Sequence, residues 1–191
     1  MKSPQEVALE VMSFYREFGS INYGERCSVN SHSFQAGLIA KKKGLDEEMI
    51  LAAFLHDIGH LTPILMQETE VGRMGEFGME QHDLIGEEFL KNNGFSPKVL
   101  ATVRNHVDAK RYLCFAEEGY FEQLSAASKE TMLYQGGPMD EEQAKAFEQV
   151  PFFEESIQIR KIDEEAKGID FEIEEESWEY FHQLIIDSLS A

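Results

Sequence analysis

The segment DEEMILAAFLHDIGH, at residues 46–60, constrains the fold more than any other part of the chain. It begins with acidic residues, which stabilise the first turn of a helix because the helix N-terminus carries a partial positive charge. It continues with apolar residues on nearly every side, a pattern typical of a helix that is buried all round. His56, Asp57 and His60 are therefore expected to be buried as well. Buried imidazole and carboxylate groups cost several kcal/mol unless they find partners, so this segment predicts a functional site.

The rest of the chain also has helical periodicity. Ser3 and Pro4 are typical of a helix start, and the run Lys41–Lys43 before Gly44 is typical of a helix end. Residues 61–79 show no clear period and contain Pro and Gly, so we expect a long loop that covers the site. The apolar spacing predicts helices over residues 4–18, 29–43, 80–92, 97–112, 139–149, 151–167 and 174–189. The sequence therefore predicts an all-α fold, with one helical-bundle domain over residues 1–191.

Composition restricts the classes of partner. Lys and Arg number 17 against 36 Asp and Glu, a formal net charge of -19, which disfavours binding to nucleic acid. No stretch approaches the roughly 20 apolar residues of a membrane span, and the N-terminus lacks the apolar run of a signal peptide. Cys27 and Cys114 are too few for a disulfide scaffold and are expected to be reduced. We expect a cytoplasmic protein whose partners include neither nucleic acid nor a membrane.

The histidines suggest what the buried site does. The chain has six, and five of them fall in or beside predicted buried helices: His32, His56, His60, His82 and His106. A lone buried histidine is most often a hydrogen-bonded core residue, but the adjacent His-Asp pair favours a metal site. The spacing of four predicts that His56 and His60 project from one helix face, with Asp57 about 100° away. Imidazole and carboxylate ligands suit iron, manganese, zinc or nickel.

Other ionisable residues are expected to be structural. His182 lies in the last predicted helix without acidic or histidine neighbours that would form a site. The acidic runs 164–165 and 172–176 are expected to lie on solvated helix faces. Gln135, before a Gly-Gly-Pro turn, is expected to have only a structural role.

Several fragments resemble a known family. His32, the HDIGH motif and a distant Asp163 resemble the HD-domain superfamily of metal phosphohydrolases and related oxygenases. Within it, the chain is most similar to the HD-domain mixed-valent diiron oxygenases, the PhnZ-like phosphonate-cleaving oxygenases. The fragments are HSFQAG (32–37), LHDIGH (55–60), RMGEFGMEQHD (73–83), NHVDAKRYL (105–113), LSAASKETM (124–132), QGGPM (135–139) and RKIDEEAK (160–167).

The resemblance implies a buried dimetal site of two iron ions, Fe(II) and Fe(III), within residues 24–167. One iron would take His32, His56 and Asp163. The other would take His82 and His106, and Asp57 would be shared. The residues implied for substrate binding are His60, Lys110, Ser128, Thr131 and Arg160 for the phosphonate, and Glu25 for an ammonium tail. Tyr23 would gate the site, although it stands one position away from the family's Tyr-x-Gly-Glu arrangement.

The implied function is iron- and O2-dependent cleavage of the C–P bond of a small 1-hydroxyphosphonate. The favoured substrate is (1R)-1-hydroxy-2-aminoethylphosphonate, which would give glycine and phosphate. The same chemistry on the N-trimethyl analogue would give glycine betaine, and on hydroxymethylphosphonate it would give formate. Two other functions stay open. An HD-type metal phosphohydrolase would activate water for attack at phosphorus, and a metal-stabilised sensor would bind a ligand without turnover.

Overall fold

The structure, a computed structural model, describes residues 2–22, 24–62 and 72–190. Over these residues the chain forms helices and no strand, and one isolated antiparallel bridge joins Arg73 to Met79. The predicted all-α fold is confirmed. The elements are α1 (Pro4–Phe18), α2 (Val29–Lys42), α3 (Glu47–Leu55), η1 (Ile58–His60), α5 (His82–Asn92), α6 (Pro97–Ala116), α7 (Tyr120–Gln123), α8 (Ala126–Tyr134), α9 (Glu141–Phe147), α10 (Phe153–Glu165) and α11 (Glu175–Ser190).

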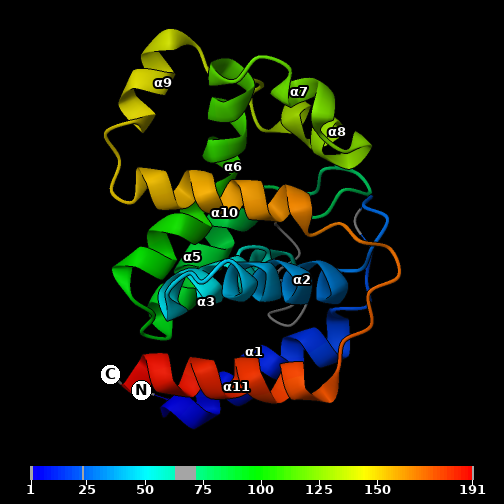
Figure 1. Cartoon of the computed structure of the whole chain (residues 1–191), viewed down its shortest axis with the longest axis vertical. Helices are drawn as coiled ribbons and strands as arrows, with labels where there is room; N and C mark the ends of the chain where they lie inside the picture. Colours follow the sequence, from blue (N-terminus) through cyan, green and yellow to red (C-terminus); the bar gives the residue numbers. More distant parts are fainter. Residues whose placement is uncertain (1, 23, 63–71, 191) are drawn as a thin grey trace.

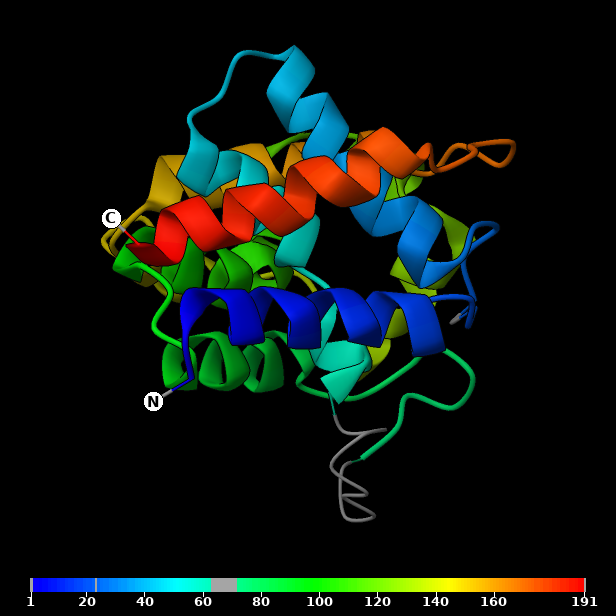
Figure 2. The ribbon, with the colours of Figure 1, turned by 90° about the horizontal axis from the view of Figure 1, so that it is seen from below.

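The helices are arranged in layers along the long axis of the molecule (Figure 1). The terminal helices α1 and α11 pack together at one end, and α7, α8 and α9 lie at the other. Between them α2 packs on α3, and α6 contacts α3, α5 and α10. Figure 2, a view from below, shows the terminal helices α1 and α11 running side by side over this end of the molecule. The middle layer thus brings together segments that are far apart in the sequence.

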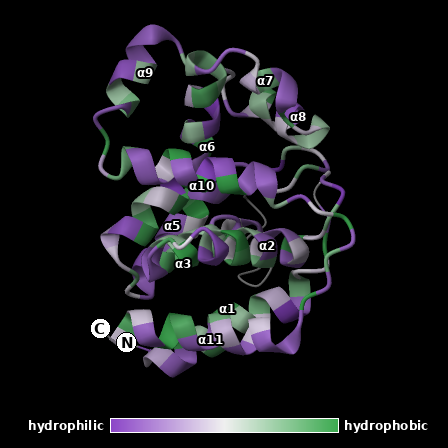
Figure 3. Cartoon of the chain, in the orientation of Figure 1, coloured by the Kyte–Doolittle hydropathy of each residue, from purple (hydrophilic) through white to green (hydrophobic). Residues whose placement is uncertain are grey.

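The main core lies among α1, α2, α3 and α11. Tyr15, Phe34, Phe54 and Phe181 are fully buried there. The rings of Phe54 and Phe181 stack with centroids 4.1 Å apart, and the Tyr15 hydroxyl donates to the backbone carbonyl of Phe54 at 2.9 Å. Hydrophobic and hydrophilic residues share the outer helices α1 and α11, as expected of helices with one buried face (Figure 3). The buried residues of α3, the helix that leads into His56 and Asp57, belong to this core.

The helix predicted from residue 46 is confirmed as buried all round, but its predicted length is wrong. Every residue from Met49 to Leu55 is buried. The α-helix ends at Leu55, and the chain continues through His56 and Asp57 into the short 3-10 helix η1. The prediction that His56 and His60 share one α-helix face is therefore wrong. The tighter path places Gly59 against the backbone of His82, where a Cβ atom would lie 1.8 Å from the carbonyl oxygen.

Two short helices, α7 and α8, were not predicted. Helix α8 is capped by Ser125, the residue before its first turn, whose hydroxyl accepts a hydrogen bond from the backbone amide of Ser128 at 3.0 Å. It ends before Gly136 and Gly137, both of which have positive φ. Such a short helix carries too little periodicity to be recognised from sequence and depends on its cap and its packing.

Only part of the predicted loop 61–79 can be assessed, because residues 63–71 lie outside the described residues. The described part turns back on itself. The Met74 amide donates to the carbonyl of Gly78 at 3.0 Å, and the Glu80 amide donates to that of Gly72 at 2.9 Å. Among the described residues, no helix is both long and apolar enough to cross a membrane. Both cysteines are free, as predicted.

Candidate functional site

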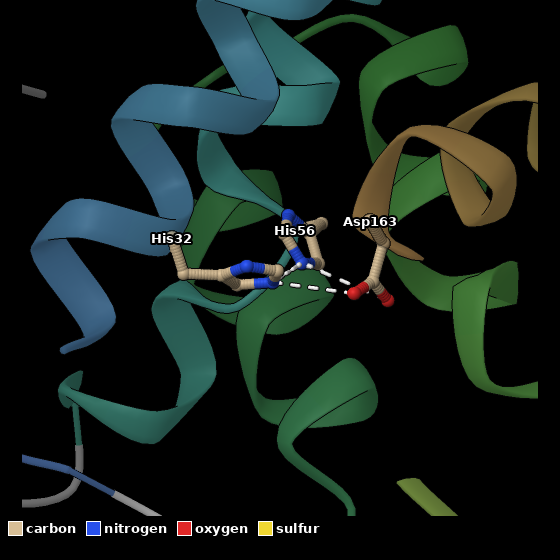
Figure 4. A group of neighbouring side chains, drawn as sticks. All are labelled: His32, His56 and Asp163. Carbon is tan, nitrogen blue, oxygen red and sulfur yellow. Dashed lines mark hydrogen bonds and ion pairs between the residues drawn. The ribbon is translucent and has the colours of Figure 1, made fainter. Parts of the chain in front are cut away.

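Six side chains expected to bind metal meet at the centre of the fold, and all six are buried. Their backbones belong to different elements, so only the folded chain brings them together. Figure 4 shows His32 on α2, His56 after α3 and Asp163 on α10 pointing toward one another. The full set comprises His32, His56, Asp57, His82, His106 and Asp163.

The six residues form two groups, each of which could hold a metal ion. The first is His32, His56 and Asp163. The Nε2 atoms of His32 and His56 lie 3.1 Å apart, and Oδ1 of Asp163 lies 3.2 Å from Nε2 of His32. Two imidazoles and one carboxylate thus converge from three elements on one point, as in many transition-metal sites.

The second group is Asp57, His82 and His106. The Nε2 atoms of the two histidines lie 3.0 Å apart, and each is 3.6 Å from Oδ1 of Asp57. The other oxygen of Asp57, Oδ2, faces the first group, at 3.5 Å from Nε2 of His32 and 3.4 Å from Nε2 of His56. Asp57 therefore lies between the groups with one oxygen directed to each.

The hydrogen bonds of the histidine rings fit metal binding. In each ring Nδ1 faces a backbone carbonyl oxygen: Ala166 for His32, Ala53 for His56, Met79 for His82 and Val103 for His106, at distances from 2.6 to 3.3 Å. These contacts place the proton of a neutral ring on Nδ1, which leaves a lone pair on Nε2. Two Nε2 lone pairs facing each other at about 3 Å repel unless a cation or a proton lies between them. The donor set therefore fits metal ions.

Electrostatics favours positive charge at the same place. Burial alone raises the pKa of a carboxyl group, but His56, His60 and His82 hold the pKa of Asp57 well below its usual range. Burial likewise opposes ionisation of Asp163, yet Arg160 and His32 hold its pKa well below the usual range. Despite burial, the hydrogen bond to Asp163 and the charges of Asp163 and Asp57 hold the pKa of His32 well above its usual value. Two buried carboxylates thus attract a cation.

His60 lies beside the second group but is differently placed. Its Nδ1 accepts a hydrogen bond from the backbone amide of Met79 at 3.1 Å, and its ring stacks on His82 with centroids 4.0 Å apart. Burial and the neighbouring His82 hold the pKa of His60 well below its usual value. A neutral His60 with Nδ1 as acceptor carries its proton on Nε2, which can donate.

A small cavity adjoins the two groups. Its volume is ≈ 50 Å³, and since about 10–15 Å³ holds one water molecule, it can take a small ligand. Each residue expected to bind substrate lines it: Glu25, His60, Lys110, Ser128, Thr131 and Arg160. The structure therefore brings all of these side chains to one cavity. Tyr23, the expected gate, lies outside the described residues.

Buried cations form one wall of the cavity. Nζ of Lys110 donates a hydrogen bond to Oγ1 of Thr131 at 3.0 Å. Burial, with the charge of Arg160 nearby, lowers the pKa of Lys110 to about 7. Arg160 donates through Nε to the hydroxyl of Tyr120 at 3.1 Å and pairs with the carboxylates of Asp163 and Glu164. An acidic protein thus has a local cationic wall suited to an anion.

Two further polar residues, Lys167 and Gln135, line the cavity although they were not predicted to do so. Lys167 also contacts Glu164. Glu164 was expected to lie on a solvated helix face, but that expectation is wrong, because Glu164 contacts Arg160, Lys167 and Ser128. The buried Oε1 of Gln135 has no hydrogen-bond partner among the described residues. Tyr120 contacts the wall through Arg160. The spacing 160, 163, 164 and 167 corresponds to one face of the predicted helix over residues 151–167, a signal that could have found Glu164 and Lys167 although the helix itself ends at Glu165.

Comparisons with known proteins agree on the family. The HD-domain family model matches residues 29–167. The [1-hydroxy-2-(trimethylamino)ethyl]phosphonate dioxygenase (glycine-betaine-forming) of Leisingera caerulea is 39% identical over 155 residues, 78% of this chain and 74% of that protein. The hydroxymethylphosphonate dioxygenase of Gimesia maris is 35% identical over 168 residues, 87% of this chain and 81% of that protein. Uncharacterized protein L432 of Acanthamoeba polyphaga mimivirus is 36% identical over 181 residues, 94% of this chain and 80% of that protein.

Proposed function

This chain belongs to the HD-domain family and, within it, to the phosphonate oxygenases that include the two dioxygenase relatives, and on that premise we propose that it cleaves the C–P bond of a small 1-hydroxyphosphonate with O2. One observation carries the proposal. Two buried groups of side chains that could hold metal ions, with one oxygen of Asp57 facing each group, adjoin a cavity with a cationic wall. A redox metal pair and an anion site are the two parts that oxidative cleavage of a phosphonate needs.

The proposed cofactor is a pair of iron ions in the Fe(II)/Fe(III) state. His32, His56 and Asp163 would hold one ion, His82 and His106 the other, and Asp57 both. This assignment is supported by the two groups of converging ligand atoms and by the Nδ1 contacts that leave each Nε2 free to bind metal. When bound, such a pair supplies O2 activation and one-electron chemistry.

The phosphonate end of the substrate is assigned to the cationic wall. Lys110 and Arg160 would neutralise the dianion, while the hydroxyls of Ser128 and Thr131 and Nε2 of His60 would donate hydrogen bonds. The assignment is supported by burial of both cations, with Lys110 4% and Arg160 3% exposed. Buried donors that are fixed before the substrate arrives hold it at low entropic cost.

The tail of the substrate is assigned to Glu25, which lines the same cavity. A buried carboxylate suits an ammonium group, so the preferred substrate is (1R)-1-hydroxy-2-aminoethylphosphonate. The relatives act, by their names, on a trimethylated and on a tail-less hydroxyphosphonate. Those two compounds are the alternative substrates for this chain.

The overall reaction is balanced without any further oxidant. A 1-hydroxyphosphonate and one O2 give one carboxylic acid and one phosphate; C1 is oxidised, O2 is reduced, and the C–P bond breaks. The residues of the chain would hold the phosphonate, point C1 toward the metal pair and keep bulk water away. Glycine, glycine betaine or formate would be the acid, according to the tail.

Phosphate release from the three hydroxyphosphonates tests the proposal, with the iron-loaded protein assayed in parallel in air and under nitrogen. We expect phosphate in air, with glycine as the second product of the aminoethyl compound, and none under nitrogen. Activity only on one of the other two hydroxyphosphonates would support the same reaction with a different substrate. Hydrolysis of a phosphate ester under nitrogen, with no reaction of any hydroxyphosphonate, would instead support a metal phosphohydrolase.

A further inference from the structure

Lys167 lines the cavity and lies between the carboxylates of Glu25 and Glu164. Its Nζ lies 2.9 Å from Oε1 of Glu25 and 3.1 Å from Oε1 of Glu164. It also donates to Oγ of Ser128 at 3.0 Å, with Oγ of Ser125 a little further away at 3.3 Å. The side chains of Lys167 and Glu25 are only 16% and 12% exposed. The ammonium of Lys167 is thus a mostly buried cation held by the carboxylate to which we assign the substrate tail.

We propose that Lys167 determines substrate specificity by competing with the cationic tail of the substrate for Glu25. The inference rests on the proposed function and extends it. A substrate ammonium and the Lys167 ammonium would both need the same carboxylate. Each binding event of a cationic tail therefore includes the loss of an existing ion pair, so the preference of Glu25 for a cationic tail is weakened.

The contacts of Lys167 explain how the site can accept substrates both with and without a cationic tail. A tail-less substrate leaves Glu25 paired with Lys167, so no buried carboxylate is left without a counter-ion. A cationic tail takes over Glu25, while Glu164 and Ser128 still hold Lys167. Lys167 then adds its charge on the side of Ser128, where the phosphonate is assigned. One lysine therefore acts as a tethered counter-ion for either class of substrate.

A ratio of specificities separates this role from a structural one. If Lys167 only fixed the segment after α10, its loss would harm all substrates alike. If it only attracted the phosphonate, its loss would again harm all of them, because they share that group. Competition for Glu25 instead predicts a change that depends on the tail.

The experiment compares the iron-loaded wild-type chain with the iron-loaded Lys167→Met variant. Both are assayed in air with 1-hydroxy-2-aminoethylphosphonate and with hydroxymethylphosphonate. The quantity is the ratio of their kcat/KM values, aminoethyl over hydroxymethyl. We expect Lys167→Met to raise this ratio about tenfold, the size of one charge-assisted hydrogen bond. The rise should appear mainly as a lower KM for the aminoethyl substrate. Glu25→Gln should lower the ratio, and adding Lys167→Met to Glu25→Gln should not change it further.

Lys161→Met is the matched control. Lys161 lies on α10, six residues before Lys167, and points outward: its Nζ lies 2.6 Å from Oε1 of Glu117, and both side chains are nearly half exposed. The control should keep the wild-type ratio. Lys167→Gln, which keeps a donor and removes the charge, provides a second variant if Lys167→Met does not fold; it should raise the ratio in the same direction.

An unchanged or lower ratio in a folded Lys167 variant would overturn the inference, as would a rise that persists in the Glu25→Gln background. Failure of the proposed function looks different: the wild-type enzyme would then release no phosphate from either compound. Activity of the wild type on one substrate supports the function whatever the ratio shows.

Discussion

Lys110 on α6 donates a hydrogen bond of 3.0 Å to Thr131 on α8, and this contact joins two helices that both line the cavity. Both residues are assigned to the phosphonate. Because burial lowers the pKa of Lys110 to about 7, its charge changes within the range in which most enzymes work. The affinity of the site for an anion should therefore depend on pH.

Substrate affinity should fall as pH rises through the pKa of Lys110. Lys110 is protonated below about pH 7 and neutral above it, and only the protonated form attracts the dianion. The expected loss reaches at most about tenfold per pH unit. Lys110→Arg stays charged throughout and should remove this loss. Anaerobic binding titrations of both proteins with the substrate, from pH 6 to 9, check this prediction. Ionisation of the phosphonate itself affects both proteins equally, so the difference between the two profiles reports on Lys110. Parallel profiles would contradict the role given to Lys110.

Loss of the Thr131 hydroxyl should weaken phosphonate binding. Thr131→Val keeps the shape of the side chain but removes the acceptor of the Lys110 bond and a proposed donor to the phosphonate. We expect the Kd of hydroxymethylphosphonate to rise about tenfold, since a hydrogen bond to a charged group contributes about 1.5–3 kcal/mol. Thr102→Val is the control, because Thr102 is fully buried and donates to the backbone carbonyl of Lys98 instead. Equal effects of the two substitutions would argue against a phosphonate role.

Asp57 should govern the binding of both metal ions, since one of its oxygens faces each group. Wild-type protein reconstituted with iron is expected to hold about two ions per chain. Asp57→Ala should lose most of both, whereas His106→Ala should lose mainly one. Elemental analysis after gel filtration measures this.

The sixth histidine supplies the control for that series. His182 lies on α11, outside both groups, and His182→Ala should keep the wild-type metal content. An Asp57→Ala protein with full metal content would refute the shared-ligand assignment. So would an equal loss in His182→Ala.

Gly59 should be intolerant of a side chain. A Cβ atom at this position would lie 1.8 Å from the carbonyl oxygen of His82, a backbone atom that cannot move without shifting a proposed metal ligand. Gly59→Ala is expected to cost about 1–3 kcal/mol or more and to lower metal content. Gly86→Ala is the control. Gly86 lies on the other side of the same contact, and the atom nearest to a Cβ added there would be 3.4 Å away. That control should stay within about 1 kcal/mol of wild type in denaturant unfolding, and a similar loss in both variants would contradict this view of the contact.

The sequence predicted those parts of the fold that depend on local signals. The start of α1 at Pro4 follows from the Ser3 cap, and burial of α3 follows from its continuous apolar surface. The end of α3 did not follow, because it depends on the close approach of Gly59 to His82, more than twenty residues away. Helix α8 was missed for a similar reason, since its stability comes from a cap and from packing rather than from periodicity.

The candidate site was predictable to a similar extent. The His-Asp pattern and the family fragments indicated six of the residues that line the cavity beside the metal-ligand candidates: Glu25, His60, Lys110, Ser128, Thr131 and Arg160. Lys167 and Glu164 were not found, because an acidic run next to a lysine usually lies on a solvated surface. Glu164 lies on α10 and pairs with Arg160, whereas Lys167 follows just after the end of that helix and turns back to pair with Glu164.

The ratio of O2 consumed to phosphate released tests the central claim most directly. An oxygen electrode and a phosphate assay would follow the same reaction of the iron-loaded enzyme with 1-hydroxy-2-aminoethylphosphonate, or with whichever of the three compounds it cleaves. Oxidative cleavage predicts about one O2 per phosphate and one carboxylic acid per phosphate. Phosphate released without any consumption of O2 would contradict it.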